Sequence, residues 1–196
     1  MRNKRITLCW LAVVLCAMGP AWGDAFTAGG GRLVALQNND GGWDWPLSDG
    51  NRNIGSAHNI VAPVGMGLAQ AYGMEAASSV QAALLKAGTY LLLKGPRQIV
   101  PEDGYFAAAL DGILGGTKYT DHVKNNFFKP LATGTFPYWG EWTVRVDTTW
   151  YLGNLRLMRI DQGLPNLGAF DCGMGLHAAR AVGMDTKPWI AATKAA

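Results

Sequence analysis

Cysteine is scarce in this sequence, since three occur among 196 residues and two of them, Cys9 and Cys16, lie within the first 23. If those residues are a removable leader, Cys172 is the single thiol of the remaining domain, which excludes an intramolecular disulfide. Phosphate-loop, dinucleotide-binding, His-Glu-x-x-His and Gly-x-Ser-x-Gly motifs are also absent from the sequence. Packing alone must therefore hold the fold, and no cofactor is expected.

The N-terminal residues have the pattern of a secretory signal peptide. Basic residues precede an apolar stretch from Ile6 to Ala17, and small residues follow it up to Gly23. The apolar stretch is shorter than the roughly 20 residues that cross a bilayer. We therefore predict a signal peptide over residues 1–23 and a secreted or periplasmic domain over residues 24–196, with no membrane attachment after cleavage.

An excess of positive charge is missing from the predicted domain. The leader holds three of the 17 basic residues and none of the 14 acidic residues, so that fourteen of each sign remain. Net charge therefore gives the domain no general attraction for nucleic acid or for anionic membranes. Nucleic acid is not an expected partner.

Apolar residues recur at helical spacing through most of the domain, and glycines separate the segments. A long loop is expected over residues 38–58, and residues 133–146 have the composition of a short extended segment. The fold class is therefore predicted to be all-α, with about eight helices. These helices are expected at Ala25–Gln37, Asn59–Tyr72, Ala76–Leu93, Gly104–Leu114, Thr120–Leu131, Thr148–Ile160, Phe170–Val182 and from Pro188 onward.

A short pattern occurs twice, as Gly-Met-Gly-Leu at residues 65–68 and again at residues 173–176, each followed by Gly-Met and an acidic residue. Small residues allow helices to approach closely, so the two copies predict related helix–turn–helix units. The second copy has little sequence after it for a partner helix. We therefore expect an incomplete helical ring, with an apolar flank covered by a missing C-terminal region or by a second subunit of a homo-oligomer.

Residues 31–43, Gly-Arg-Leu-Val-Ala-Leu-Gln-Asn-Asn-Asp-Gly-Gly-Trp, resemble the Gln–Trp repeat of squalene-hopene cyclases and the Gln-x-x-Asp-Gly-Gly-Trp repeat of protein prenyltransferases. Both families are α/α toroids, so the resemblance implies a toroid-like array of helical hairpins. In that repeat the glutamine and tryptophan tie a helix end to the next unit, which implies structural roles for Gln37 and Trp43.

The sequence departs from the catalytic patterns of both families. The Asp-x-Asp-Asp motif of the cyclases is absent. Prenyltransferases hold zinc with an aspartate, a cysteine two residues later and a distant histidine, whereas Asp171 and Cys172 are adjacent and His177 follows closely. Adjacent helical residues point about 100° apart and cannot both bind one metal without distortion. Neither cyclase nor prenyltransferase chemistry, nor a bound metal, is expected.

The long loop contains the candidate ligand-binding residues Trp43, Asp44, Trp45 and Asp49. Indole faces cover the apolar side of a sugar ring, and carboxylates accept its hydroxyls. The more favoured interpretation is that the indoles return to the core while the aspartates cap turns. Asp111, within an apolar helix, is a further candidate that either lines a cavity or faces outward.

Two other sets of polar residues are weaker candidates for a catalytic or metal-binding site. Glu102 and Asp103 have the composition of a carboxylate pair for glycoside or uronide cleavage, but a helix N-terminal cap accounts for them better. Asp49, Asn51 and Asn53 alternate as in a calcium loop, although residue 54 is not the glycine that such a loop requires.

Two functions remain open at this point. The first is a ligand-binding or interaction module that binds a carbohydrate or a small apolar ligand. The alternative is a secreted polysaccharide-active enzyme, a lyase or glycoside hydrolase of the α/α toroid type. The alternative requires Trp43, Trp45 and at least two carboxylates to meet in one open groove.

Overall fold

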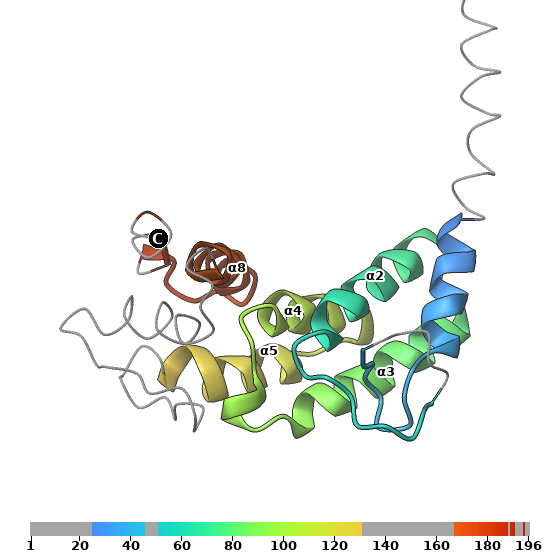
Figure 1. Ribbon diagram of the computed structural model, residues 1–196. Coiled ribbons are helices and arrows are strands. Elements are labelled where there is room, and N and C mark those ends of the chain that lie inside the picture. The colour runs from blue at the N-terminus through green and yellow to red at the C-terminus, as the bar shows by residue number, and fades with distance from the viewer. Residues whose placement is uncertain (1–24, 46–50, 131–166, 188, 191–193, 195–196) are drawn as a thin grey trace, which may run out of the picture.

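The computed structural model describes residues 25–45, 51–130, 167–187, 189, 190 and 194, and every regular element within them is helical (Figure 1). The all-α class is therefore confirmed for this part of the chain. A first helical segment covers residues 25–35. It is followed by α2 (Val61–Met74), α3 (Ser78–Leu93), the 3-10 turn η1 (Pro96–Gln98), α4 (Asp103–Leu114), α5 (Lys118–Val123), the π-helical turn η2 (Lys124–Phe128) and α8 (Leu167–Ala181).

The predicted helices that fall on described residues are present, and their boundaries lie within three residues of those expected except at Thr120–Leu131, where α5 ends at Val123 and the π-helical turn η2 follows. The sequence pattern does not predict η1 or the π-helical turn. Residues 38–45 and 51–58 contain no helix, in agreement with the predicted loop. The helix expected at Thr148–Ile160 and the extended segment expected at residues 133–146 lie outside the described residues.

Helix α4 lies at the centre of the described structure, in contact with α2, α3, α5 and α8 (Figure 1). Its side chains Phe106, Ala107 and Leu110 are fully buried. Helices α2 and α3 pack against each other, and α4 and α5 do the same. Successive helices therefore pair as hairpins, and burial of their shared apolar surface is the main stabilising contribution.

Glycines mark the points of closest approach between helices. A Cβ atom added to Gly65 of α2 would lie 2.4 Å from the Phe106 ring of α4, and one added to Gly104 of α4 would lie 2.7 Å from Ala178 of α8. A Cβ atom added to Gly88 of α3 would lie 2.6 Å from the Tyr119 side chain. These helices can approach each other only because a hydrogen atom takes the place of a side chain.

The repeated Gly-Met-Gly-Leu pattern lies in helices in both copies, but the copies pack through different glycines. In α2 the close contact is at Gly65, whereas its counterpart in α8, Gly173, has nothing within 4 Å of an added Cβ atom. In α8 the close contact is at Gly175, where an added Cβ atom would lie 1.7 Å from the Trp189 ring. The neighbours differ because α2 packs on α4, while Gly175 packs on the segment that follows α8.

A pair of glycine substitutions tests this account of packing. We expect Gly65→Ala to lower the free energy of unfolding by about 1–3 kcal/mol, because the new methyl group overlaps the Phe106 ring. Gly112 of α4 is exposed and has nothing within 4 Å of an added Cβ atom. Gly112→Ala should therefore raise the free energy of unfolding by up to about 1 kcal/mol. Urea unfolding followed by circular dichroism measures the free energy of unfolding of both variants. Equal changes in the two variants would contradict the close packing of Gly65 against Phe106.

Candidate functional site

The turn after the first helix, residues 37–43, is held by the side chains at its two ends. The Gln37 amide donates hydrogen bonds to the carbonyl oxygens of Gly41 (2.9 Å) and of Ala83 in α3 (2.8 Å). Trp43 is fully buried, and its Nε1 donates to the Leu33 carbonyl at 2.9 Å. Gln37 and Trp43 therefore have structural roles, because they join the first helical segment to the following turn and to α3.

Asp40 connects the two ends of the long loop. Its Oδ1 accepts hydrogen bonds from the Gly42 amide (3.0 Å) and the Ser56 hydroxyl (2.6 Å), and its Oδ2 accepts one from the Ser56 amide (2.8 Å). Gly41 has a φ of +98°, and an added Cβ atom would lie 2.4 Å from the Lys86 carbonyl oxygen. The turn therefore requires glycine at this position, both for its backbone angle and for its closeness to α3.

The candidate ligand-binding residues of the loop differ sharply in exposure. Trp43 is in the core, whereas Trp45 is 68% exposed. Asp44 is only 7% exposed, and its Oδ2 has no hydrogen-bond partner within the part of the chain that the structure describes. Asp49 lies outside the described residues. The loop thus presents one indole to solvent, directly after a buried carboxylate in the chain.

Asp111 and Asp103 have other environments. The two carboxylate oxygens of Asp111 accept hydrogen bonds from the backbone amides of Tyr119 (3.2 Å) and Thr120 (2.8 Å), which satisfies free donors in the first turn of α5. Asp103 is fully buried in the first turn of α4. The convergence of both indoles with two carboxylates on one open groove is not found among the described residues, because Trp43 and Asp103 are completely enclosed.

Asp103 forms a buried ion pair with Lys94, the residue that follows α3. The Lys94 ammonium lies 2.8 Å from each Asp103 carboxylate oxygen and donates a third hydrogen bond to the His58 carbonyl oxygen at 2.6 Å. The Val100 amide also donates to Asp103 Oδ2 at 2.9 Å. Burial raises the pKa of Asp103, and the Lys94 cation opposes that shift. Asp103 lies in the first turn of a helix, as the sequence predicts. Its carboxylate, however, binds the Lys94 ammonium at the end of α3.

Two half-buried histidines flank this ion pair. Burial lowers the pKa of His58, and the nearby Lys94 cation lowers it further. Burial also lowers the pKa of His122, whose Nε2 donates to the Lys94 carbonyl oxygen at 3.1 Å. Because Asn126 Nδ2 lies 3.3 Å from His122 Nδ1, the neutral tautomer with its proton on Nε2 fits both contacts. Both imidazoles are therefore held preferentially in the neutral form.

Sequence reasoning does not single out Lys94. The sequence Lys-Gly-Pro predicts only a helix end, and the lysine lies nine residues before Asp103. The sequence does offer one indication of this ion pair, because a basic residue follows one helix and an acidic residue begins the next helix soon afterwards. That spacing allows a contact across a short connection but does not show that the contact is buried.

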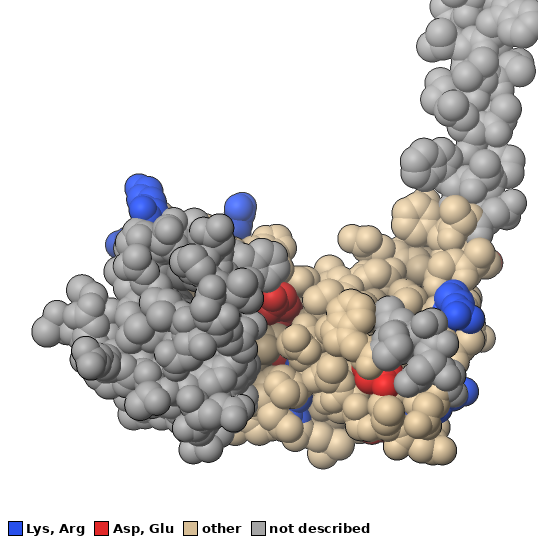
Figure 2. Space-filling model, in the orientation of Figure 1, with Lys and Arg blue, Asp and Glu red and all other residues tan. Residues whose placement is uncertain are grey.

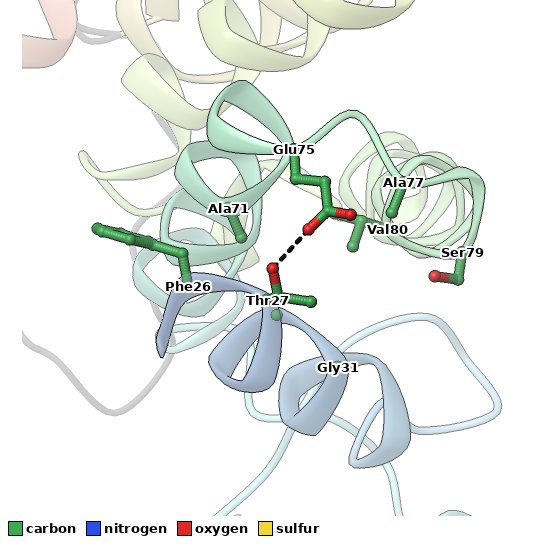
Figure 3. A pocket seen from close by; sticks show the side chains of 9 residues that line it. Phe26, Thr27, Gly31, Ala71, Glu75, Ala77, Ser79 and Val80 are labelled. Carbon is green, nitrogen blue, oxygen red and sulfur yellow. Dashed lines mark hydrogen bonds between the residues drawn. The ribbon is translucent and has the colours of Figure 1, made fainter. Parts of the chain in front are cut away.

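The depressions formed entirely by described residues include one beside the first helical segment and one beside α8. One is a small cleft of about 120 Å³ between the first helical segment and the α2–α3 turn, where Thr27 donates a hydrogen bond to Glu75 across the opening (Figure 3). The other is an open groove of about 520 Å³ beside α8. We call it the α8 groove; its lining residues are Gly173, Leu176, His177, Arg180, Thr186 and Ile190.

On the face of the molecule that Figure 2 shows, the charged side chains of the described residues are dispersed. Figure 2 shows single acidic and basic side chains separated by uncharged surface on the visible face, with no extended patch of one sign. Among the residues with described positions, no three His, Cys, Asp or Glu side chains are arranged to hold a metal ion. Within the same residues, no helix is long and apolar enough to cross a membrane.

Comparison of the chain with protein-family models, with curated proteins and with solved structures finds no match.

Removal of the Lys94 charge should cost stability in a pH-dependent way. We expect Lys94→Met to lower the free energy of unfolding by about 3–5 kcal/mol at neutral pH, because Asp103 then remains buried without its counter-ion. Burial raises the folded-state pKa of Asp103 above its usual 3.8, so the protonated carboxyl is tolerated at acid pH. The loss should therefore be smallest at pH values below the folded-state pKa of Asp103 in the wild-type protein, which lies above 3.8, and should grow as the pH rises from that pKa to the still higher pKa of Asp103 in the variant.

Urea unfolding of the Lys94→Met variant between acid and neutral pH measures this dependence. Lys86→Met is the matched control, because Lys86 is an exposed lysine on α3 and should change stability little at any pH. A loss in Lys94→Met that does not vary with pH would contradict the role assigned to Asp103.

Proposed function

We propose that this protein is a secreted or periplasmic ligand-binding module that acts without cyclase or prenyltransferase chemistry and binds carbohydrate at Asp44 and Trp45. The observation that carries the proposal is the exposed indole of Trp45 next in the chain to a buried carboxylate oxygen of Asp44 that has no partner among the described residues. The scaffold is proposed to be an α/α toroid-like array of helical hairpins.

The Asp44 carboxylate gives the stronger argument for a polar ligand. Buried polar atoms in proteins nearly always have a hydrogen-bond partner, and leaving one without a partner costs free energy. A hydroxyl group of a sugar is a suitable donor for a carboxylate oxygen. A polyol whose hydroxyl displaced the atoms that cover Asp44 Oδ2 would therefore remove a cost that this buried oxygen carries.

Trp45 supports a ligand with an apolar face. An indole that is 68% exposed leaves a large flat apolar surface in water. The C–H face of a pyranose ring covers such a surface and leaves the ring hydroxyls free for polar groups nearby. A carboxylate and an indole together therefore suit a carbohydrate better than a wholly apolar ligand.

Three of the described carboxylates favour binding over the alternative of polysaccharide cleavage. Glycoside hydrolysis needs two carboxyl groups on either side of the scissile bond. Asp40 is engaged by Ser56 and Gly42, Asp103 by Lys94, and Asp111 by the first turn of α5. Each of these three groups therefore supports the scaffold. The toroid-like arrangement is supported by the packing of successive helices as hairpins and by the hydrogen bond from Gln37 to α3.

Polysaccharide binding with matched variants tests the proposal. The purified protein is mixed with insoluble cellulose, chitin and peptidoglycan and with soluble pectin and glucans, and binding is measured by sedimentation and calorimetry. We expect binding to at least one of them, with Trp45→Ala weakening it by at least about tenfold because the stacking surface is lost. Asp44→Ala should also weaken it. Leu93→Ala, at an apolar side chain that is 77% exposed on α3, should have no effect.

Two results would contradict the proposal. The first is an absence of binding across the panel, or binding that Trp45→Ala and Asp44→Ala leave unchanged. The second is release of new reducing ends or unsaturated products from a bound polysaccharide, which would show catalysis in place of simple binding.

A further inference from the structure

The α8 groove is a second candidate site, and it does not depend on the Asp44–Trp45 proposal. One wall is a single stripe of α8, because Gly173, Leu176, His177 and Arg180 follow the i, i+3, i+4, i+7 spacing of one helix face. The other wall contains Thr186 and Ile190, which are one helical turn apart and linked by a 2.9 Å backbone hydrogen bond. The groove therefore lies between two short helical walls.

The turn between these walls has a defined geometry. Gly183 has a φ of +72°, its amide donates to the Arg180 carbonyl (3.3 Å), and the Met184 amide donates to the Ala179 carbonyl (2.8 Å). This is the hydrogen-bond pattern of a Schellman motif, which ends a helix at a left-handed glycine. Asp185 Oδ1 then accepts the Lys187 amide at 3.0 Å. The direction of the second wall is thus fixed by local hydrogen bonds.

Core packing fixes the distance between the walls. Trp189 is fully buried and lies so close to α8 that its ring occupies the space where a side chain at Gly175 would be. The Trp189 ring also contacts Phe127 and Phe128, with ring centroids 6.4 Å and 5.7 Å away. The groove is therefore preorganised on a buried aromatic cluster, which reduces the ordering cost of binding.

The lining residues combine positive charge with apolar surface. Arg180 is exposed and makes no ion pair with any described residue, and no acidic side chain lines the groove. His177 and Thr186 add hydrogen-bonding groups, and the His177 ring lies 5.2 Å from that of Tyr105. Leu176 lines the groove, and Ile190 is 39% exposed there. A guanidinium beside aliphatic side chains matches a ligand with an anionic head and an apolar body.

We propose that the α8 groove binds a medium-chain organic carboxylate, with the carboxylate on Arg180 and the chain along Leu176 and Ile190. The groove volume of about 520 Å³ lies within the roughly 300–1,000 Å³ typical of small-molecule sites. Arg180 is at the open edge, so the carboxylate keeps part of its hydration while the chain leaves water. Burial of the chain supplies affinity, and the guanidinium supplies selectivity for the anion.

Calorimetric titration of the full chain with octanoate tests this site. Octanoate should bind, while octanol, which lacks the charge, and acetate, which lacks the chain, should each bind at least about tenfold more weakly. Arg180→Gln and Ile190→Asn should each weaken octanoate binding by at least about tenfold. Two variants are used because they test the two ends of the ligand separately, and circular dichroism confirms that each is folded.

Matched control variants show whether octanoate binds in the α8 groove or elsewhere on the protein. Arg32→Gln removes an exposed arginine from the first helical segment and should leave octanoate affinity unchanged. Trp45→Ala should also leave it unchanged, so failure of the carbohydrate proposal and failure of this one are distinguishable. The proposal is overturned if octanoate does not bind, if octanol binds equally well, or if folded Arg180→Gln binds octanoate like Arg32→Gln.

Discussion

The ion pair between Lys94 and Asp103 is the contact on which the arrangement of the described helices most depends. Lys94 has three N–H donors, and all three are used, two by Asp103 and one by the His58 carbonyl oxygen. The pair joins the end of α3 to the start of α4, and α4 contacts every other labelled α-helix. Removing either partner of a buried ion pair leaves the other charge without compensation, so this pair constrains how the end of α3, the start of α4 and the loop at His58 meet.

Much of the fold could be predicted because it depends on local pattern. Helical spacing of apolar residues predicted the boundaries of α2, α3 and α4 to within two residues, and the resemblance at residues 31–43 implied the structural roles of Gln37 and Trp43. Burial of Lys94 could not be predicted, because a charged residue directly after a helix is usually taken to mark the exposed end of that helix. Whether such a residue is enclosed depends on α5 and the loop at His58, which are distant in sequence.

The candidate site was harder to predict than the fold, because neighbouring residues of similar chemistry have opposite surroundings. Trp43 and Trp45 are two residues apart, yet the first is fully buried and the second is exposed. The positive φ at Gly41 and the contacts of Asp40 set the direction of the turn, and so decide which indole faces the core. The α8 groove depends on Trp189 packing against Gly175, a contact that helical periodicity does not reveal.

The turn at Asp40 also bears on chemical ageing. An Asp-Gly sequence can form a succinimide when the glycine amide nitrogen attacks the aspartate carboxyl carbon and a water molecule is lost, and hydrolysis of the ring then gives isoaspartate. Here the Gly41 amide donates to the Asn38 carbonyl at 3.0 Å, while the Asp40 carboxylate is held by Ser56 and the Gly42 amide. Attack would require both groups to leave these partners. The hydrogen bonds that shape the loop therefore also protect its backbone from isomerisation as long as the domain stays folded.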